Sequence, residues 1–278
     1  MPMQGIDIRT NPLKDMDTPI VTLTTDWSAS DYYAGRVKGR LYSMIPDVRV
    51  VDINHNLPVA DRITAAFVVS NACREFPAGT IHIIDAAGLR SNDDVVIVEA
   101  NGQYYILLDN GLPNMVFGTT FSRAVKVEKN TVPQHGAFLA YDLYCHLAMR
   151  IAGGTDLAEL GSPCTQLQQA LPYSYADVEG RLKLYITYID SYGNAYLGIT
   201  HSEFENIRAG RSFELMVRQE PITTITSTQD IQKKSENVEL LLTVASTGHL
   251  MLTISQATEN ASRLFALRVK EMLTVTFK

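Results

Sequence analysis

Residues 20–31 read Ile-Val-Thr-Leu-Thr-Thr-Asp-Trp-Ser-Ala-Ser-Asp, and this stretch decides the fold. Its first half is rich in β-favouring residues, whereas its second half is small and polar, as in a loop. α/β proteins present side chains in this way at the carboxyl end of a parallel strand. Asp26 and Asp31 are therefore the first candidate ligand-binding residues. An alternative is that Asp26 only ends the strand and Asp31 caps the following helix, since aspartate is favoured in both positions.

The residues after this stretch continue an alternation of helices and strands. Apolar side chains recur at helical spacing over 32–45 and a short apolar strand follows at 49–53, which predicts a parallel crossover unit. Further elements are expected as helices at 61–76 and 137–152 and as strands at 80–84, 95–100, 104–108 and 124–127. We therefore predict an α/β domain over residues 19–165, with a mostly parallel sheet and flanking helices.

The C-terminal part of the chain has a different character, because strand-like stretches dominate and helical patterns are few. These stretches are 181–188, 196–200, 212–217, 238–244, 249–254 and 272–277. We predict that residues 178–278 form a separate antiparallel β-barrel domain. Residues 1–18 are expected to be a surface extension, and 166–177 a linker between the two domains.

The composition narrows the classes of partner. The net charge is -6 and the lysines and arginines are scattered, so neither nucleic acid nor a membrane is expected as a partner. No apolar run approaches the roughly 20 residues needed to cross a bilayer, and the start lacks a signal-peptide pattern, so a cytoplasmic location is expected. The three cysteines are widely spaced among apolar residues, which predicts reduced thiols rather than disulfides or a zinc site.

Several common catalytic motifs are missing from the sequence. It contains no glycine-rich phosphate loop, no His-Glu-x-x-His and no Gly-x-Ser-x-Gly, which argues against P-loop, zinc-protease and serine-hydrolase chemistry. What remains is a set of polar loops at predicted strand ends and the turn Asp-Ser-Tyr-Gly-Asn at 190–194. Acidic groups beside an aromatic ring and an amide suit a cationic, aromatic, hydroxyl-bearing small molecule.

A series of short motifs carries a resemblance to a known family. Thr-Leu-Thr-Thr-Asp at 22–26 is followed by Asp31 and by Val-Lys-Gly-x-Leu-Tyr-Ser-x-x-Pro-Asp-Val-x-Val-Val-Asp-Ile. Later motifs, in order, are Phe-Pro-x-Gly-Thr-Ile-His at 76–82, Asn-Gly-Gln-Tyr-Tyr at 101–105, Asp-Asn-Gly-Leu at 109–112, Leu-Ala-Glu-Leu-Gly-x-Pro at 157–163 and Ile-Asp-x-Tyr-Gly-Asn at 189–194. Together they resemble the S-adenosylmethionine hydrolase, or hydroxide adenosyltransferase, family, which is related to fluorinases and chlorinases.

The resemblance implies an α/β domain, a β-barrel domain and a homotrimer whose sites lie between subunits. It implies that Asp26 holds the ribose hydroxyls and that Asp31 lies near the methionine part of S-adenosylmethionine. The C-terminal domain would contribute its remaining contacts: Asp190 to the methionine ammonium, Tyr192 and Asn194 to the adenine, and Ser246 and Thr247 to the methionine carboxylate. A carboxylate suits a diol or an ammonium, and an amide can both donate to and accept from adenine.

The reaction implied by the resemblance is in-line displacement at the ribose C5′, with water or hydroxide as nucleophile and methionine as leaving group. Family hydrolases use an Asp, Arg and His trio. His135 matches the family's histidine, Asp85 matches its aspartate if a gap of about two residues is allowed in the preceding strand, and Arg90 would substitute for the arginine from a different loop position. The loop at 85–94 departs from the family pattern, because acidic residues replace a pair of arginines. No metal or other cofactor is expected, and S-adenosylmethionine is the substrate or ligand.

Two main functions therefore stay open at this point, beside a third and weaker one in which the nucleophile or the adenosyl substrate is different. The first is hydrolysis of S-adenosylmethionine to adenosine and methionine, and the second is binding of an adenosyl ligand without catalysis. The altered loop at 85–94 separates them, since His135 could also be a helix cap, and Asp85 and Arg90 a solvated turn. Halide chemistry is not expected, because Ala60 stands where the halogenases carry a larger side chain.

Overall fold

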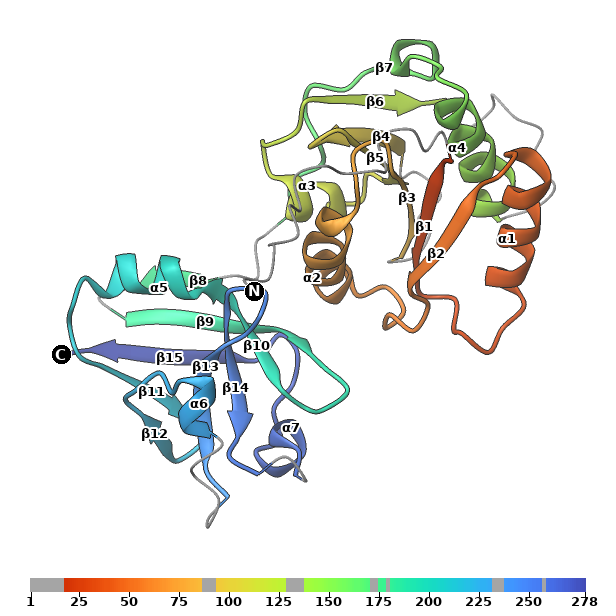
Figure 1. Ribbon diagram of the computed structural model, residues 1–278. Helices are drawn as coiled ribbons and strands as arrows, with labels where there is room; N and C mark the ends of the chain where they lie inside the picture. The colour runs from red at the N-terminus through yellow and green to blue at the C-terminus, as the bar shows by residue number, and fades with distance from the viewer. Residues whose placement is uncertain are drawn as a thin grey trace, which may run out of the picture.

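The computed structural model describes residues 18–86, 94–128, 138–170, 175–178, 181–231, 238–256 and 259–278. These residues form two sheets, each with a hydrophobic core of its own (Figure 1). None of the helices in the described part of the chain is long and apolar enough to cross a membrane.

The N-terminal sheet is mixed, and its strands lie in the order β2-β1-β3-β5-β4-β6-β7. The strands are β1 Ile20–Thr25, β2 Arg49–Asn54, β3 Ile81–Asp85, β4 Val95–Ala100, β5 Gln103–Leu108, β6 Arg123–Val127 and β7 Ser162–Pro163. Neighbours from β2 to β5 run parallel, whereas β4 pairs antiparallel with β5 through the predicted Asn101-Gly102 turn. Both turn residues have positive φ, as a two-residue hairpin requires.

Helices cover both faces of this sheet, so the predicted α/β architecture is confirmed. α1 (Tyr33–Met44) and α4 (Cys145–Ala152) share a core with Val95 and Ile97, whereas α2 (Arg62–Ala72) and α3 (Leu112–Phe117) share one with Val96 and Val98. Successive β4 side chains thus point to opposite faces, as strand geometry requires. Single 3-10 turns lie at Cys73–Glu75 and Leu157–Glu159.

Two helical features differ from the sequence prediction. α3 was not predicted, because its six residues are too few to show a periodic pattern. The helix expected at 137–152 is described from residue 138, and it contains a π-helical segment at Ala140–Tyr144 before α4. Such π segments are rare and carry no distinctive sequence pattern.

The C-terminal sheet is antiparallel and nearly closed, which confirms the predicted barrel. Its strands are β8 Tyr175–Val178, β9 Arg181–Ile189, β10 Ala195–Thr200, β11 Phe213–Val217, β12 Glu220–Ile222, β13 Leu240–Val244, β14 His249–Ile254 and β15 Met272–Phe277. The order runs β12-β11-β15-β9-β10-β14-β13, with β8 on β9. A bridge between Ile225 and Leu242 joins the two ends of the sheet.

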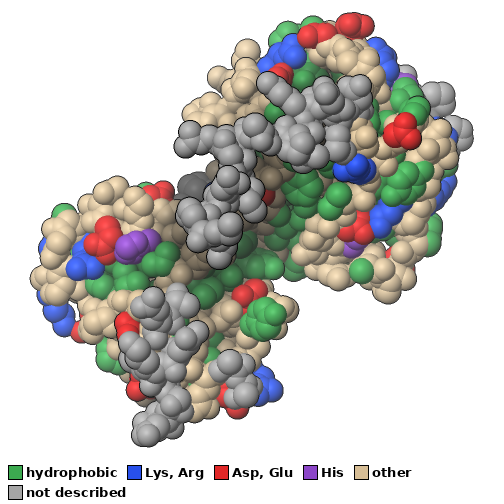
Figure 2. All heavy atoms as spheres, viewed as in Figure 1, with side chains coloured by type: hydrophobic (Ala, Val, Ile, Leu, Met, Phe, Trp, Pro, Cys, Tyr) green, Lys and Arg blue, Asp and Glu red, His purple; other side chains and the backbone are tan. Residues whose placement is uncertain are grey.

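Short helices and two strands of this region, β8 and β12, lie outside the sequence prediction. Helix α5 (His201–Arg208) begins with a capping box formed by Thr200 and Glu203, and α6 (Thr228–Ile231) and α7 (Ala261–Leu264) are single turns. β8 falls where the sequence suggested a linker. Helix α2 of the first domain packs against β9 of the barrel, and hydrophobic side chains gather where the two domains meet (Figures 1 and 2).

Candidate functional site

Two predicted carboxylates meet at the carboxyl edge of the N-terminal sheet. Strand β1 lies between β2 and β3 in the sheet. The chain therefore passes from β1 to β2 on one side and then crosses to β3 on the other side of β1. Ligands bind at such topological switch points in α/β proteins. Asp26 directly follows β1, Asp85 ends β3, and Thr25 is in register with Asp85. The Asp26 amide donates to the Asp85 carbonyl at 3.3 Å, which brings both residues to one place.

Trp27 is a site residue that the sequence pattern does not predict. Its indole Nε1 donates a hydrogen bond of 2.9 Å to Asp85 Oδ2. The ring lies 5.1 Å from the Phe138 ring and 6.1 Å from the His55 ring, measured between centroids. Trp27 is the one tryptophan of the chain and directly follows Asp26, which is the signal that could have found it. It fixes the orientation of the Asp85 carboxylate.

The electrostatic environment of Asp85 suits proton transfer near neutral pH. Burial raises the pKa of Asp85 to about 6, and the negative charge of Asp26 adds to this increase. The hydrogen bond from Trp27 lowers the pKa and so opposes these two effects. A carboxylate with this pKa is mostly ionised at pH 7 and can accept a proton in a catalytic step.

Asp26 and Asp31 occupy different surroundings. Asp26 is half-buried, and its Oδ2 accepts from the Ala60 amide at 3.4 Å. Asp31 is exposed, and its amide donates to the Ser28 carbonyl at 3.4 Å. The N-cap of α1 is Tyr32, with no side-chain capping bond, so the alternative of an Asp31 cap does not match the structure.

His55 lies next to the loop that follows β1 and is buried. Its Nδ1 is 2.7 Å from Thr25 Oγ1, and its Nε2 is 3.0 Å from Asp52 Oδ1. Because both ring nitrogens face protein groups, His55 supports the loop that carries Asp26 and Trp27.

The turn at 190–194 in the barrel is ordered by its own aspartate. Asp190 Oδ1 accepts from the amides of Tyr192 at 3.0 Å and Asn194 at 2.9 Å, and Oδ2 accepts from Asn194 Nδ2 at 2.9 Å. Tyr196 donates to Oδ2 over a longer 3.4 Å. Gly193 has a φ of +85, and a Cβ there would overlap the Asn260 side chain, so this position needs glycine. The turn holds the Tyr192 ring outward, with 78% of the residue exposed.

The second predicted barrel loop joins β13 to β14. Ser246 is exposed at its tip, and Thr247 Oγ1 lies 3.1 Å from His249 Nδ1. The Gly248 amide donates to the Ala245 carbonyl at 2.9 Å and closes the turn. Both hydroxyls are therefore presented on a short, hydrogen-bonded loop.

The other two members of the predicted catalytic trio, Arg90 and His135, lie outside the described residues. Their roles stay predictions.

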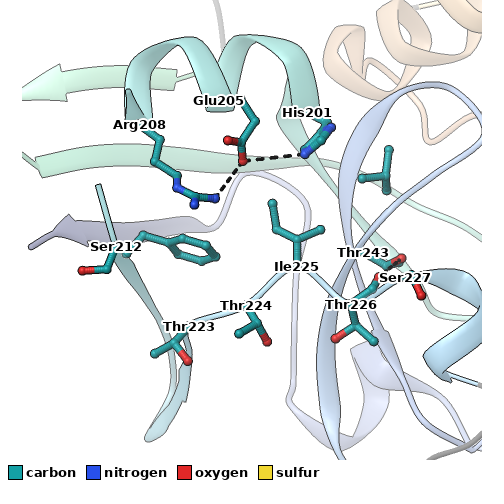
Figure 3. Close-up of a pocket in the computed structure, with 12 residues that line it drawn as sticks. His201, Glu205, Arg208, Ser212, Thr223, Thr224, Ile225, Thr226, Ser227 and Thr243 are labelled. Atoms are coloured by element: carbon teal, nitrogen blue, oxygen red, sulfur yellow. Dashed lines mark hydrogen bonds and ion pairs between the residues drawn. The ribbon is translucent and has the colours of Figure 1, made fainter. Parts of the chain in front are cut away.

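A cavity of about 840 Å³ lies at the seam of the barrel (Figure 3). It borders the turn that carries Ser246 and Thr247, since the amide of His201 in its lining donates to the Gly248 carbonyl at 2.9 Å. Glu205 of α5 faces it, 2.9 Å from Arg208 and 3.7 Å from His201. Hydroxyl side chains of the segment at 223–227 form the opposite wall (Figure 3). Because Arg208 is already paired with Glu205, this cavity offers less unbalanced charge for a charged ligand than the Asp26 and Asp85 edge.

Comparison with known proteins shows the family of both halves of the chain. The family model for the SAM hydroxide adenosyltransferase N-terminal domain matches residues 21–161, and that for the C-terminal domain matches 184–274. An (R)-S-adenosyl-L-methionine hydrolase from Salinispora tropica is 25% identical over 86% of this chain and 91% of its own length. One from Methanocaldococcus jannaschii is 24% identical over 69% and 71%, and a fluorinase from Actinoplanes sp. is 24% identical over 72% and 77%.

Solved structures share the fold. An uncharacterized conserved protein from Thermotoga maritima superposes with a TM-score of 0.79 at 18% identity, covering 92% of this chain and 99% of its own. A conserved hypothetical protein from Thermus thermophilus gives a TM-score of 0.71 at 21% identity, covering 94% and 100%. With both of its domains matched in order, the chain belongs to the SAM hydroxide adenosyltransferase family.

Proposed function

We propose that this protein hydrolyses S-adenosylmethionine to adenosine and methionine. The observation that carries the proposal is the pair of carboxylates at the β1 and β3 edge, which differ in surroundings and therefore in chemistry. Asp26 is half-buried and suits hydrogen bonds from the ribose hydroxyls. Asp85, which Trp27 orients and whose pKa burial raises, suits the acceptance of a proton.

The rest of the substrate would contact the residues that family membership points to. Asp31 would lie near the methionine part, and Tyr192 and Asn194 would contact the adenine. Asp190 would receive the methionine ammonium at Oδ2, where the Tyr196 hydrogen bond is the longest of its four and the easiest to replace. Ser246 and Thr247 would hydrogen-bond the methionine carboxylate.

We propose that each site is formed by two neighbouring subunits of a homotrimer. One subunit would contribute the residues of the α/β domain, and its neighbour those of the barrel. The exposure of the Tyr192 ring in a single chain supports this arrangement, because an aromatic contact to adenine is useful only once another surface closes on it.

The proposed reaction forms one bond and breaks one. A water oxygen attacks C5′ in line with the sulfonium, the C5′–S bond breaks, and methionine leaves with the electron pair as a neutral thioether. The proton of the attacking water passes to Asp85 and then to solvent. Because the sulfonium already leaves readily, the protein has mainly to position the water and exclude other solvent. Arg90 and His135 are proposed to orient the water.

The test is to incubate the purified full-length protein with S-adenosylmethionine, follow products by chromatography, and measure binding by calorimetry. Equal release of adenosine and methionine is expected. Asp26→Ala should abolish binding, because it removes the acceptor for the ribose diol, whereas Glu220→Ala, an exposed site on β12, is the matched control. Binding without products would support the noncatalytic alternative, and wild-type affinity in Asp26→Ala would contradict the pocket assignment.

A further inference from the structure

Phe67 of helix α2 inserts into an aromatic cluster of the other domain. Its ring stacks on Tyr188 with centroids 4.7 Å apart and planes 12° apart. It meets Tyr196 edge-on at 5.0 Å and lies 5.2 Å from the His249 ring. The same side chain lines a cavity of about 420 Å³ between the domains, together with His249. Phe67 is thus a major contact between helix α2 and the barrel.

The rings around Phe67 are connected to the proposed methionine-binding residues. Tyr188 and Tyr196 are cross-strand neighbours on β9 and β10, on either side of the turn at 190–194. The Tyr196 hydroxyl donates to Asp190 Oδ2 at 3.4 Å. His249 Nδ1 lies 3.1 Å from Thr247 Oγ1. A shift of the Phe67 ring would therefore displace the Tyr196 side chain that contacts the 190–194 turn and the His249 side chain that contacts Thr247.

The start of the same helix is tied to the proposed ribose site. Asp61 caps α2 by accepting from the Ile63 amide at 3.2 Å, and the preceding Ala60 amide donates to Asp26 Oδ2 at 3.4 Å. Asp61 Oδ1 also lies 3.2 Å from Lys270 Nζ of the barrel. One 11-residue helix therefore connects the loop of Asp26 with the loops of Asp190 and Thr247.

We propose that Phe67 is a positioning residue that sets the conformation of the two barrel loops for the methionine part of the substrate. It does not touch the substrate in this proposal, and it acts through Tyr196 on Asp190 and through His249 on Thr247. The inference rests on the proposed function for its ligand. The effect of the Phe67 ring on the conformation of the two barrel loops can be measured without any ligand.

The test compares Phe67→Ala with Phe67→Tyr, which keeps the ring, and with Phe117→Ala. Phe117 is a buried aromatic residue of α3 that packs against Tyr105 within the first domain, so it controls for general destabilisation. Phe67→Ala should raise the KM for S-adenosylmethionine about tenfold, the size expected when a hydrogen bond to a charged group is lost, with kcat little changed. Affinity for adenosine, which would contact Tyr192 and Asn194 of the same turn but neither Asp190 nor Thr247, should also fall, but by less. Phe67→Tyr should restore the wild-type KM.

A ligand-free measurement separates failure of this inference from failure of the proposed function. Burial lowers the pKa of the His249 imidazole, so an NMR titration of Phe67→Ala should show it closer to the ordinary value. Amide resonances of 190–194 and 246–248 should also move in Phe67→Ala and stay in place in Phe117→Ala. If wild type does not bind S-adenosylmethionine, the proposed function fails while these shifts still report on positioning. Unchanged resonances, or equal KM values in both alanine variants, would overturn the inference.

Discussion

Replacing Asp85 with asparagine should make the protein more stable at neutral pH while removing its activity. The ionised carboxylate is held in surroundings that raise its pKa to about 6, against about 3.9 for an ordinary aspartate. This difference means that ionisation of Asp85 costs the folded state about 3 kcal/mol at pH 7. Asparagine has a similar shape, carries no charge, and keeps an oxygen that can accept from Trp27 Nε1.

The sign of the pH dependence follows from linkage. Because the folded state holds the Asp85 proton more tightly than the unfolded state, wild-type stability falls as the pH rises from about 4 to about 6. The asparagine variant lacks this loss. The free energy of unfolding of the variant should therefore equal that of wild type at pH 4. The difference in favour of the variant should grow up to about pH 6 and stay near 3 kcal/mol above that pH.

The assay is urea unfolding followed by circular dichroism at pH 4 and pH 7.5, for wild type, Asp85→Asn and Asp47→Asn. Asp47 is exposed in the turn before β2 and has a positive φ that asparagine tolerates, so this control should change the free energy of unfolding by less than about 0.5 kcal/mol. An Asp85→Asn variant that is no more stable than wild type at pH 7.5 would show that ionisation of Asp85 does not destabilise the folded state. An advantage of the variant that persists at pH 4 would show that this ionisation is not its cause.

Two further predictions concern catalysis. His135→Ala should lower turnover about a hundredfold, the usual contribution of a proton-transferring or water-orienting side chain, while calorimetry shows nearly unchanged binding; unchanged turnover would remove His135 from the mechanism. Trp27→Phe removes the donor that lowers the pKa of Asp85, so the acidic limb of the turnover profile, expected near pH 6 in wild type, should move to higher pH; a limb that stays in place or moves lower would show that Asp85 does not control it.

The sequence was informative where local chemistry determines structure. The change from β-branched to small polar residues after Thr25 predicted the strand end, and with it the place of Asp26. The hairpin at Asn101-Gly102 was predictable for the same reason, since few residues adopt the positive φ that its turn needs. The antiparallel barrel followed from repeated short strand-like stretches.

Features that depend on contacts between distant residues were not predictable. The role of Trp27 depends on Asp85 at the end of another strand, and that of Phe67 depends on rings of the other domain. Nothing in the local sequence of either residue records these partners. The raised pKa of Asp85 was missed for the same reason, because it results from burial and from the nearby charge of Asp26.

Hydrolysis by this protein is tested most directly by a single-turnover reaction of S-adenosylmethionine in water enriched in oxygen-18, with mass spectrometry of the adenosine formed. Attack by water at C5′ predicts that the label appears in the 5′-hydroxyl of adenosine and that methionine remains unlabelled. Adenosine without label would contradict water attack at C5′. Absence of adenosine, under conditions where S-adenosylmethionine binds, would contradict hydrolysis itself.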